Sequence, residues 1–127
     1  MYSVRIRDHI MIAHSLHHEG FGIASQLHGA TYIVDATFFS PGLNEMNVVV
    51  DIGLAAVQLK KVLSRLHFRN LDTMEEFNDR ITTTEYLAAY IHRSLAGEIK
   101  PFFSGVLRIE LGESHVAWAS YEGDTAI

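Results

Sequence analysis

The feature that most limits how this chain can fold is a pair of predicted helices with extended segments before and after it. From residue 52 to 66, apolar residues recur at helical spacing on one face. A second helical stretch opens with Thr82 and Glu85, which have the spacing of a capping box, and Gly97 is expected to end it. Extended segments precede and follow this pair of helices.

Those extended segments show either the alternation or the composition of β-strands. They are residues 2–7, 31–39, 106–111 and 115–121, and "VVV" at 48–50 is also expected to be extended. The link "GES" (112–114) predicts a tight hairpin between the last two strands. The resulting order, ββααββ, predicts an α+β domain with a four-stranded antiparallel sheet and both helices on one face. Its unpaired edge strands favour a homo-oligomer.

Composition narrows the class of protein. The chain has 127 residues, nearly half of them apolar, which predicts a single folded domain over 1–127. A formal charge of −5 argues against nucleic-acid binding. No apolar run is long enough for a membrane helix, and the N-terminus lacks the apolar core of a signal peptide, so we expect a cytoplasmic protein with no membrane partner. The absence of cysteine excludes thiolate ligands and a cysteine nucleophile.

Six short motifs, in chain order and at compatible spacing, resemble one family. They are "IMIAHSL", "LHGATY", "NVVVDIGLAAVQLKKVL", "RLHFRNLD", "TTTEYLAAYI" and "LRIELGES". Together they are similar to the 6-pyruvoyltetrahydropterin synthase and 6-carboxytetrahydropterin synthase family, which has the tunnelling fold. This resemblance implies a pterin-like small-molecule ligand bound between subunits and a hexamer made of two trimers.

In that family three histidines bind zinc, which polarises the pterin side chain. The resemblance assigns two of these metal ligands to His14 and His28, but the third position is Ala30. Two imidazoles do not make a tight zinc site, so zinc is a doubtful cofactor here. Three nearby residues could replace the third ligand, namely His17, His18 or Glu19.

The family's proton-transfer residues are also replaced. The stretch "GFGIASQ" before His28 has no cysteine, and the aspartate–histidine pair corresponds to His67 and Phe68. His67 could act as a base, or it could only complement the dipole at a helix C-terminus. The catalytic candidates are therefore His67 and, in the loop after the first strand, His17 and His18.

The residues implied to hold the ring are retained better. Glu110 corresponds to the glutamate that accepts N–H bonds from the pterin, and Thr83, Thr84 and Glu85 form the second ring-binding stretch. An alternative is that Glu110 pairs with a cation such as Arg108, and that the threonines only cap a helix.

Two main hypotheses follow. The first is a divergent lyase-family enzyme acting on a pterin or related heterocycle, with a degenerate zinc and proton-relay site and an altered or lost reaction. The second is a non-catalytic oligomeric module that binds a pterin or purine ring or acts as a scaffold. A weaker third is a metal-free, aldolase-like enzyme in which a glutamate orients the ring and a histidine moves the proton.

Overall fold

The computed structural model describes residues 1–126 and confirms the predicted α+β architecture. Its strands and α-helices follow the predicted order, with short 3₁₀ segments at Glu19–Ser25, Leu71–Thr73 and Glu75–Phe77. The elements are β1 (Tyr2–His14), β2 (His28–Ser40), α1 (Ile52–Ser64), β3 (Arg69–Asn70), α2 (Thr84–Ile99), β4 (Val106–Ser114) and β5 (Ala117–Asp124). No helix among these described residues is long and apolar enough to cross a membrane.

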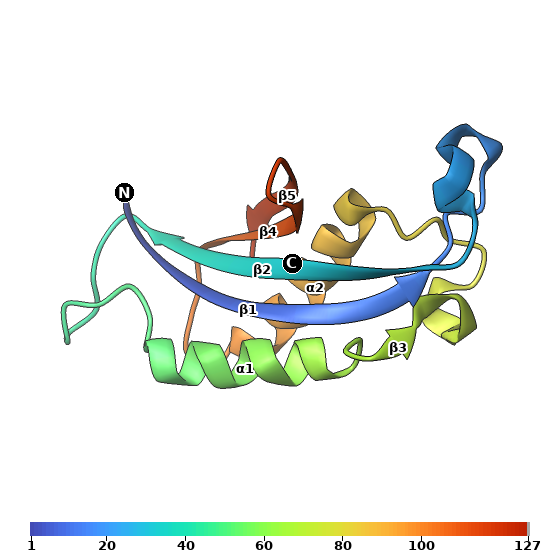
Figure 1. Ribbon diagram of the computed structural model, residues 1–127. Coiled ribbons are helices and arrows are strands. Elements are labelled where there is room, and N and C mark those ends of the chain that lie inside the picture. The colour runs from blue at the N-terminus through green and yellow to red at the C-terminus, as the bar shows by residue number, and fades with distance from the viewer. Residues whose placement is uncertain (127) are drawn as a thin grey trace.

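The strands form one sheet in the order β3-β1-β2-β4-β5. The antiparallel ladder of β1 and β2 runs without a shift from the pair Tyr2–Ser40 to the pair His14–His28. Figure 1 shows these two strands as the long curved ribbon of the molecule, with α1 alongside β1. The loop that joins the two strands projects beyond one end of the sheet.

The sheet has five strands where four were predicted. The additional strand, β3, contains two residues and pairs in parallel with Ile12 and Ala13 of β1. Such a short strand between a helix and a 3₁₀ segment leaves no alternating pattern in the sequence. It covers only a small part of the outer edge of β1. The four antiparallel strands occur in the predicted order, but β1 continues to His14 where residues 2–7 were predicted, and β2 begins at His28 where residue 31 was predicted.

The core lies between the helices and one face of the sheet. Side chains from alternate positions of β1, β2 and β4 are buried against α1 and α2, with α2 packed on β4 and β5 and α1 on β1. The strand residues of this helix-covered face are Ile10, Ile12, Tyr32, Val34, Ala36, Phe38, Leu107, Ile109 and Leu111. The opposite face carries mainly polar residues, so the two-residue period predicted from the sequence is confirmed.

The boundaries of α2 correct two expectations. The N-cap is Thr83, not Thr82, and the Thr83 hydroxyl accepts from the Tyr86 N–H at 3.1 Å. Thr82 cannot cap because its buried hydroxyl contacts the ring of His14. The helix also continues through Gly97 to Ile99, since its buried stripe extends that far and Pro101 lies two residues on.

Two other boundaries differ from the prediction. Residues 48–50 form no strand, because Val50 is buried just before Asp51, which caps α1 through the Leu54 N–H. The hairpin turn lies between Ser114 and Ala117, so "GES" belongs to β4. A register shift between Gly112 and Ser114 marks a β-bulge there, and an extra unpaired residue at a bulge hides the strand's period from sequence inspection.

Replacing the cap residue Thr83 by alanine should lower the free energy of unfolding by about 1 kcal/mol, the usual value of a lost N-cap hydrogen bond. Urea denaturation of Thr83→Ala and Thr83→Ser measures it, because serine keeps the accepting oxygen. Equal stability of the two variants would contradict the assignment of Thr83 as the cap.

Candidate functional site

Two imidazoles lie side by side where β1 and β2 end. His14 and His28 are direct partners in the ladder, and their ring centroids are 4.7 Å apart with an interplanar angle of 65°. By the two-residue period, both rings are on the helix-covered face, in line with Ile12 of β1 and Ala30 of β2. His14 is 2% exposed, whereas His28 is half-buried.

Each ring is held through its Nδ1 atom. The Nδ1 of His14 is 2.9 Å from the Thr82 hydroxyl, which comes from the segment before α2. The Nδ1 of His28 donates to the carbonyl oxygen of Gln26 at 2.8 Å. These bonds fix the orientation of both rings and leave the Nε2 atoms available for other partners.

Burial, and next the neighbouring His28, lower the pKa of His14 below its ordinary value of 6.5. Asp72 and the contact with Thr82 act in the opposite direction but do not outweigh burial. His14 is therefore neutral at neutral pH. A neutral imidazole is the form that binds a metal or accepts a proton.

The donors present do not fit a zinc ion of the usual kind. Catalytic zinc sites use three protein ligands, and the third place on this face belongs to Ala30, opposite Ile12. In the part of the chain that the structure describes, no group of three or more His, Cys, Asp or Glu side chains is arranged to hold a metal ion. His17, His18 and Glu19 thus do not complete the pair within one chain.

His17 lies in a separate cluster with Ser15 and Asp72. Asp72 accepts from the Ser15 hydroxyl at 2.6 Å and from the Ser15 N–H at 3.1 Å, and its carboxylate is 3.5 Å from His17 Nε2. Burial alone would raise the pKa of Asp72, but the bonds from Ser15 and the nearby rings of His17 and His14 lower it below its ordinary value. Asp72 is therefore an anion that braces both the strand end and His17.

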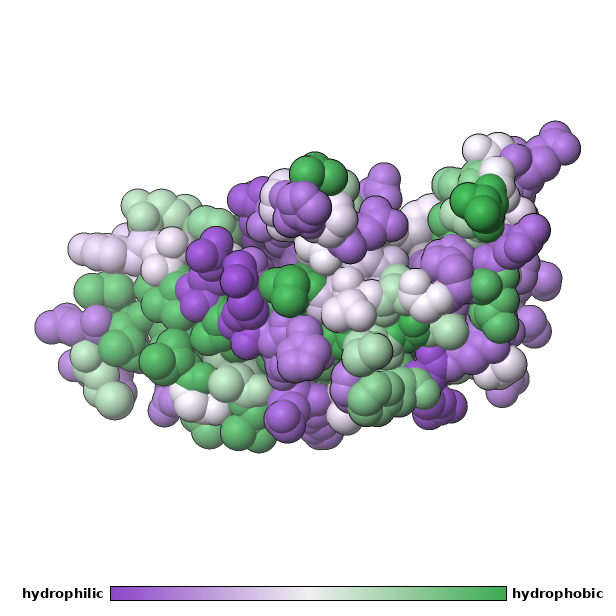
Figure 2. All heavy atoms as spheres, in the orientation of Figure 1, coloured by the Kyte–Doolittle hydropathy of each residue, from purple (hydrophilic) through white to green (hydrophobic). Residues whose placement is uncertain are grey.

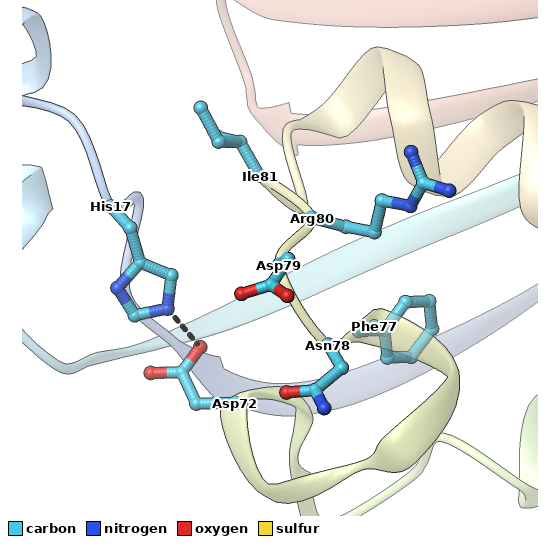
Figure 3. A pocket seen from close by; sticks show the side chains of 7 residues that line it. All are labelled: His17, Asp72, Phe77, Asn78, Asp79, Arg80 and Ile81. Atoms are coloured by element: carbon cyan, nitrogen blue, oxygen red, sulfur yellow. Dashed lines mark ion pairs between the residues drawn. The ribbon is translucent and has the colours of Figure 1, made fainter.

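This cluster borders a cavity of about 480 Å³. Figure 3 shows His17 and Asp72 joined on one side, Asp79 directed toward them, and Arg80 pointing away. The remaining lining residues are Phe77, Asn78 and Ile81. The cavity has the size of a small-molecule site, and the segment 77–81 that forms its wall leads directly to Thr82.

Two further histidine candidates lie elsewhere. His18 caps the 3₁₀ segment by accepting from the Gly20 N–H at 2.9 Å, and Glu19 is in the first turn of that segment. His67 follows the end of α1, and its Nδ1 accepts from the Met11 N–H at 3.1 Å at the outer edge of β1. The ring of His67 contacts His9 and Phe68 at this edge, away from the pair of His14 and His28.

Glu110 lies on the face of the sheet opposite the imidazole pair. It is the ladder partner of Asp35 and Ser120, and Arg108 donates to it at 3.5 Å. The adjacent Asp35 is buried and holds Arg7 through two hydrogen bonds of 2.7 and 3.0 Å. A ring-binding role for Glu110 stays a prediction, and the cation pairing considered from the sequence is present.

A second carboxylate, Glu113, was missed from the sequence. It is the exposed residue at the bulge of β4. Burial raises the pKa of Tyr32, the nearby Thr84 hydroxyl lowers it, and the charges of Glu113 and Glu85 raise it further. The structure thus gathers Glu113, Glu85 and Thr84 around Tyr32, which lies four residues from His28 on the same face.

Comparison with known proteins decides the family. A profile described as 6-pyruvoyl tetrahydropterin synthase matches residues 3–124. The chain belongs to the 6-pyruvoyl tetrahydropterin synthase family. No curated protein matches it at a significant level.

Solved members of the 6-pyruvoyl tetrahydropterin synthase family share the fold. The Caenorhabditis elegans synthase superposes with a TM-score of 0.84 at 21% identity, covering 96% of this chain and 95% of that one. The Plasmodium falciparum synthase gives 0.76 at 17% identity, with 97% and 98% covered. The Plasmodium vivax synthase gives 0.73 at 17% identity, with 98% and 99% covered. At these identities the superpositions establish the fold alone.

Against this family background, the structure brings together some of the predicted residues and separates others. His14 and His28 form a pair, and Thr84 and Glu85 lie near Tyr32 in the same layer. Thr83 is engaged as a helix cap, while His67 and Glu110 lie at the outer edge of β1 and on the opposite face. Thr82 was missed as a partner of His14, because the sequence pattern assigned it to the helix cap.

Proposed function

We propose that this protein binds a pterin-like heterocycle and carries out acid–base chemistry on it with histidine side chains, in place of the full three-histidine zinc arrangement. The oriented His14–His28 pair carries this proposal. Two imidazoles held at their Nδ1 atoms, on the helix-covered face near the end of the sheet, present proton-accepting atoms in a fixed direction. The acid–base chemistry proposed for these two imidazoles does not depend on a metal ion.

The pair suits removal of a proton near a carbonyl or hydroxyl group. Because the Nδ1–H of His28 donates to Gln26, neutral His28 carries its free electron pair on Nε2. His14 is kept neutral by burial. A neutral imidazole can take a proton at neutral pH, and the adjacent ring can then share the positive charge through a hydrogen bond or a water. His17, which is exposed and braced by Asp72, is a further group for proton exchange with solvent.

A carboxylate is needed to orient the ring, because an aminopyrimidine edge offers two parallel N–H donors. We propose Glu113 for this role, in preference to Glu110. Glu113 is exposed at the bulge, whereas Glu110 accepts from Arg108 and neighbours the ion pair of Asp35 and Arg7. Thr84 and Glu85 lie near the same tyrosine as Glu113 and would border the ring.

The same surfaces favour a homo-oligomer. β5 is an edge strand, and Trp118 and Tyr121 on it are 58% and 40% exposed. Exposed apolar side chains also gather over the start of α1 and the loop before it (Figure 2). Pairing of free strand edges between copies would cover β5 and lengthen the sheet. We propose a hexamer, as the family resemblance implies, and a cytoplasmic location.

The second candidate is a non-catalytic ring-binding module of the same fold. It is favoured by Ala30 in place of a third ligand and by the absence of any cysteine. Both candidates require ring binding, and only the first requires turnover.

The test begins with binding. Calorimetric titration of the purified protein with 7,8-dihydroneopterin should show a saturable site. Glu113→Gln should lower the affinity about 10- to 100-fold, because a pair of charge-assisted hydrogen bonds is lost. The matched variant Glu110→Gln should bind like the wild type.

The outcomes are distinct. If Glu110→Gln is the weaker variant, Glu110 is the anchor and our choice of carboxylate is wrong. If the wild type does not bind the pterin at all, the proposed function is wrong. Incubation of the chelator-treated protein with the same compound, with products separated by chromatography, then distinguishes an enzyme from a binding module.

A further inference from the structure

The cavity beside His17 has a negatively charged lining. Two of its residues, Asp72 and Asp79, are acidic, and Figure 3 shows the Asp79 carboxylate directed toward Asp72 and His17. Arg80, the lining residue with a fixed positive charge, points away from them. Asp72 is an anion that accepts from the N–H and the hydroxyl of Ser15. A molecule that enters this hollow of about 480 Å³ therefore meets hydrogen-bond acceptors and negative charge.

The carboxylate of Asp79 is available to a molecule in the cavity. Its side chain is exposed, and none of the ion pairs within residues 1–126 includes it. The backbone of Asp79 has a φ of +60°, a conformation that aspartate and asparagine adopt more readily than most residues. Asparagine can thus replace Asp79 without added backbone strain, which makes the charge separately testable.

The cavity lies next to the imidazole pair, on the side away from the proposed ring anchor. In the strand order β3-β1-β2-β4, Glu113 of β4 is on one side of the pair His14–His28, and Asp72, which follows directly after β3, is on the other. Asp72 accepts from the residue after His14, and neighbouring strands are about 4.8 Å apart. The far end of a ring that is anchored at Glu113 and reaches the imidazole pair is therefore directed toward this cavity.

We propose that the cavity receives the side chain of the bound heterocycle and selects an uncharged, hydroxyl-bearing chain over a phosphorylated one. This inference rests on the proposed function and narrows its substrate class to pterins with a polyol side chain. Hydroxyl groups donate to carboxylates in charge-assisted hydrogen bonds, which Asp72 and Asp79 can both accept. A phosphate group would place further negative charge beside the same two anions, and like charges repel strongly in a partly enclosed site.

Calorimetric titration with three compounds that share one ring tests the selection. The compound 7,8-dihydropterin has no side chain, 7,8-dihydroneopterin has a chain with hydroxyl groups, and the third compound is the triphosphate of dihydroneopterin. The wild type should bind dihydroneopterin about tenfold more tightly than dihydropterin, because the hydroxyl groups add charge-assisted hydrogen bonds. It should bind the triphosphate about tenfold more weakly than dihydroneopterin, or worse.

The variant Asp79→Asn removes one charge from the cavity and keeps the shape of the side chain. Its affinity for dihydroneopterin should fall about threefold to tenfold, its affinity for the triphosphate should rise, and its affinity for dihydropterin should stay at the wild-type value. The matched control is Glu45→Gln, which removes an exposed charge from the loop after β2, at the opposite end of the sheet. The control should bind all three compounds like the wild type, and both variants should melt at the wild-type temperature.

The outcomes separate this inference from the proposed function. If dihydropterin binds but Asp79→Asn leaves the affinities for the other two compounds unchanged, the selection by the cavity is wrong and the proposed function stands. A wild type that binds the triphosphate as tightly as dihydroneopterin leads to the same conclusion. Loss of dihydropterin binding in Asp79→Asn would show that the cavity holds the ring itself, which also contradicts the inference. A wild type that binds none of the three compounds overturns the proposed function, and the inference with it.

Discussion

Replacement of Ala30 by histidine should convert the protein into a tight zinc binder. Position 30 is on the same face of β2 as His28 and faces Ile12, one ladder position inward from the pair His14–His28. A third imidazole there would complete the three-ligand set that zinc requires. Loss of a residue that merely supports a ligand costs about 10- to 100-fold in metal affinity, so the gain of a full ligand should exceed that range.

The measurement is metal content after dialysis, with affinity from competition against a chromogenic chelator. The matched control is Thr31→His, which places the imidazole on the opposite face of the same strand. We expect one zinc per chain in Ala30→His and no gain in the control. A wild type that already holds one zinc per chain with equal affinity would show that another residue, or a neighbouring subunit, supplies the third ligand.

Replacement of His14 by alanine should reduce turnover of a reduced pterin by about 100- to 10,000-fold, the range for loss of a general base. The steady-state rate with 7,8-dihydroneopterin measures it, and His9→Ala, a surface histidine on the other face of β1, is the control. A His14→Ala enzyme with wild-type rate would exclude His14 as the base. If the wild type shows no turnover, the ring-binding module is the correct function.

The pH dependence of the wild-type rate tests the same role of His14, because the rate should fall when His14 becomes protonated. Because burial lowers the pKa of His14, the neutral base is retained as the pH falls to 6.5, and it is lost only below that value. Thr82→Val removes the partner of Nδ1 with little change in shape. It should lower kcat and shift this acidic limb, while KM changes little, because Thr82 is buried and positions the ring of His14.

The sequence predicted the architecture well because long alternating strands and amphipathic helices leave clear patterns. Exposure alternates along most of β1, and most of the buried residues of β2 lie on one face, while both helices bury a continuous stripe. The exact residue at which a helix begins was harder to predict, because neighbouring residues of the same type compete for the cap position. Thr82 and Thr83 are identical as cap candidates, and only the distant ring of His14 decides that Thr82 is occupied and Thr83 begins the helix.

The positions of the candidate site residues were harder to predict than the architecture. The predicted strands 2–7 and 31–39 contain neither His14 nor His28, so it was the family resemblance that put the two residues together. In the structure the longer strands make them ladder partners and place Ala30 on the same face. The bulge of β4 shows why Glu113 was missed, since an irregularity of one residue changes the face on which a side chain lies. The hydrogen bonds between Met11 and residues 67–68 could not be found from the sequence, because on Met11 they involve only the backbone N–H and carbonyl groups.

The unshifted ladder of β1 and β2 also restricts how this chain can change in length during evolution. Insertions in the projecting loop between His14 and His28 leave every pair of the ladder in place. Deletion of one residue within either strand would displace the pairs beyond it by one position, which moves side chains to the opposite face. Length variation among descendants of this sequence should therefore concentrate in residues 15–27 and spare the two strands.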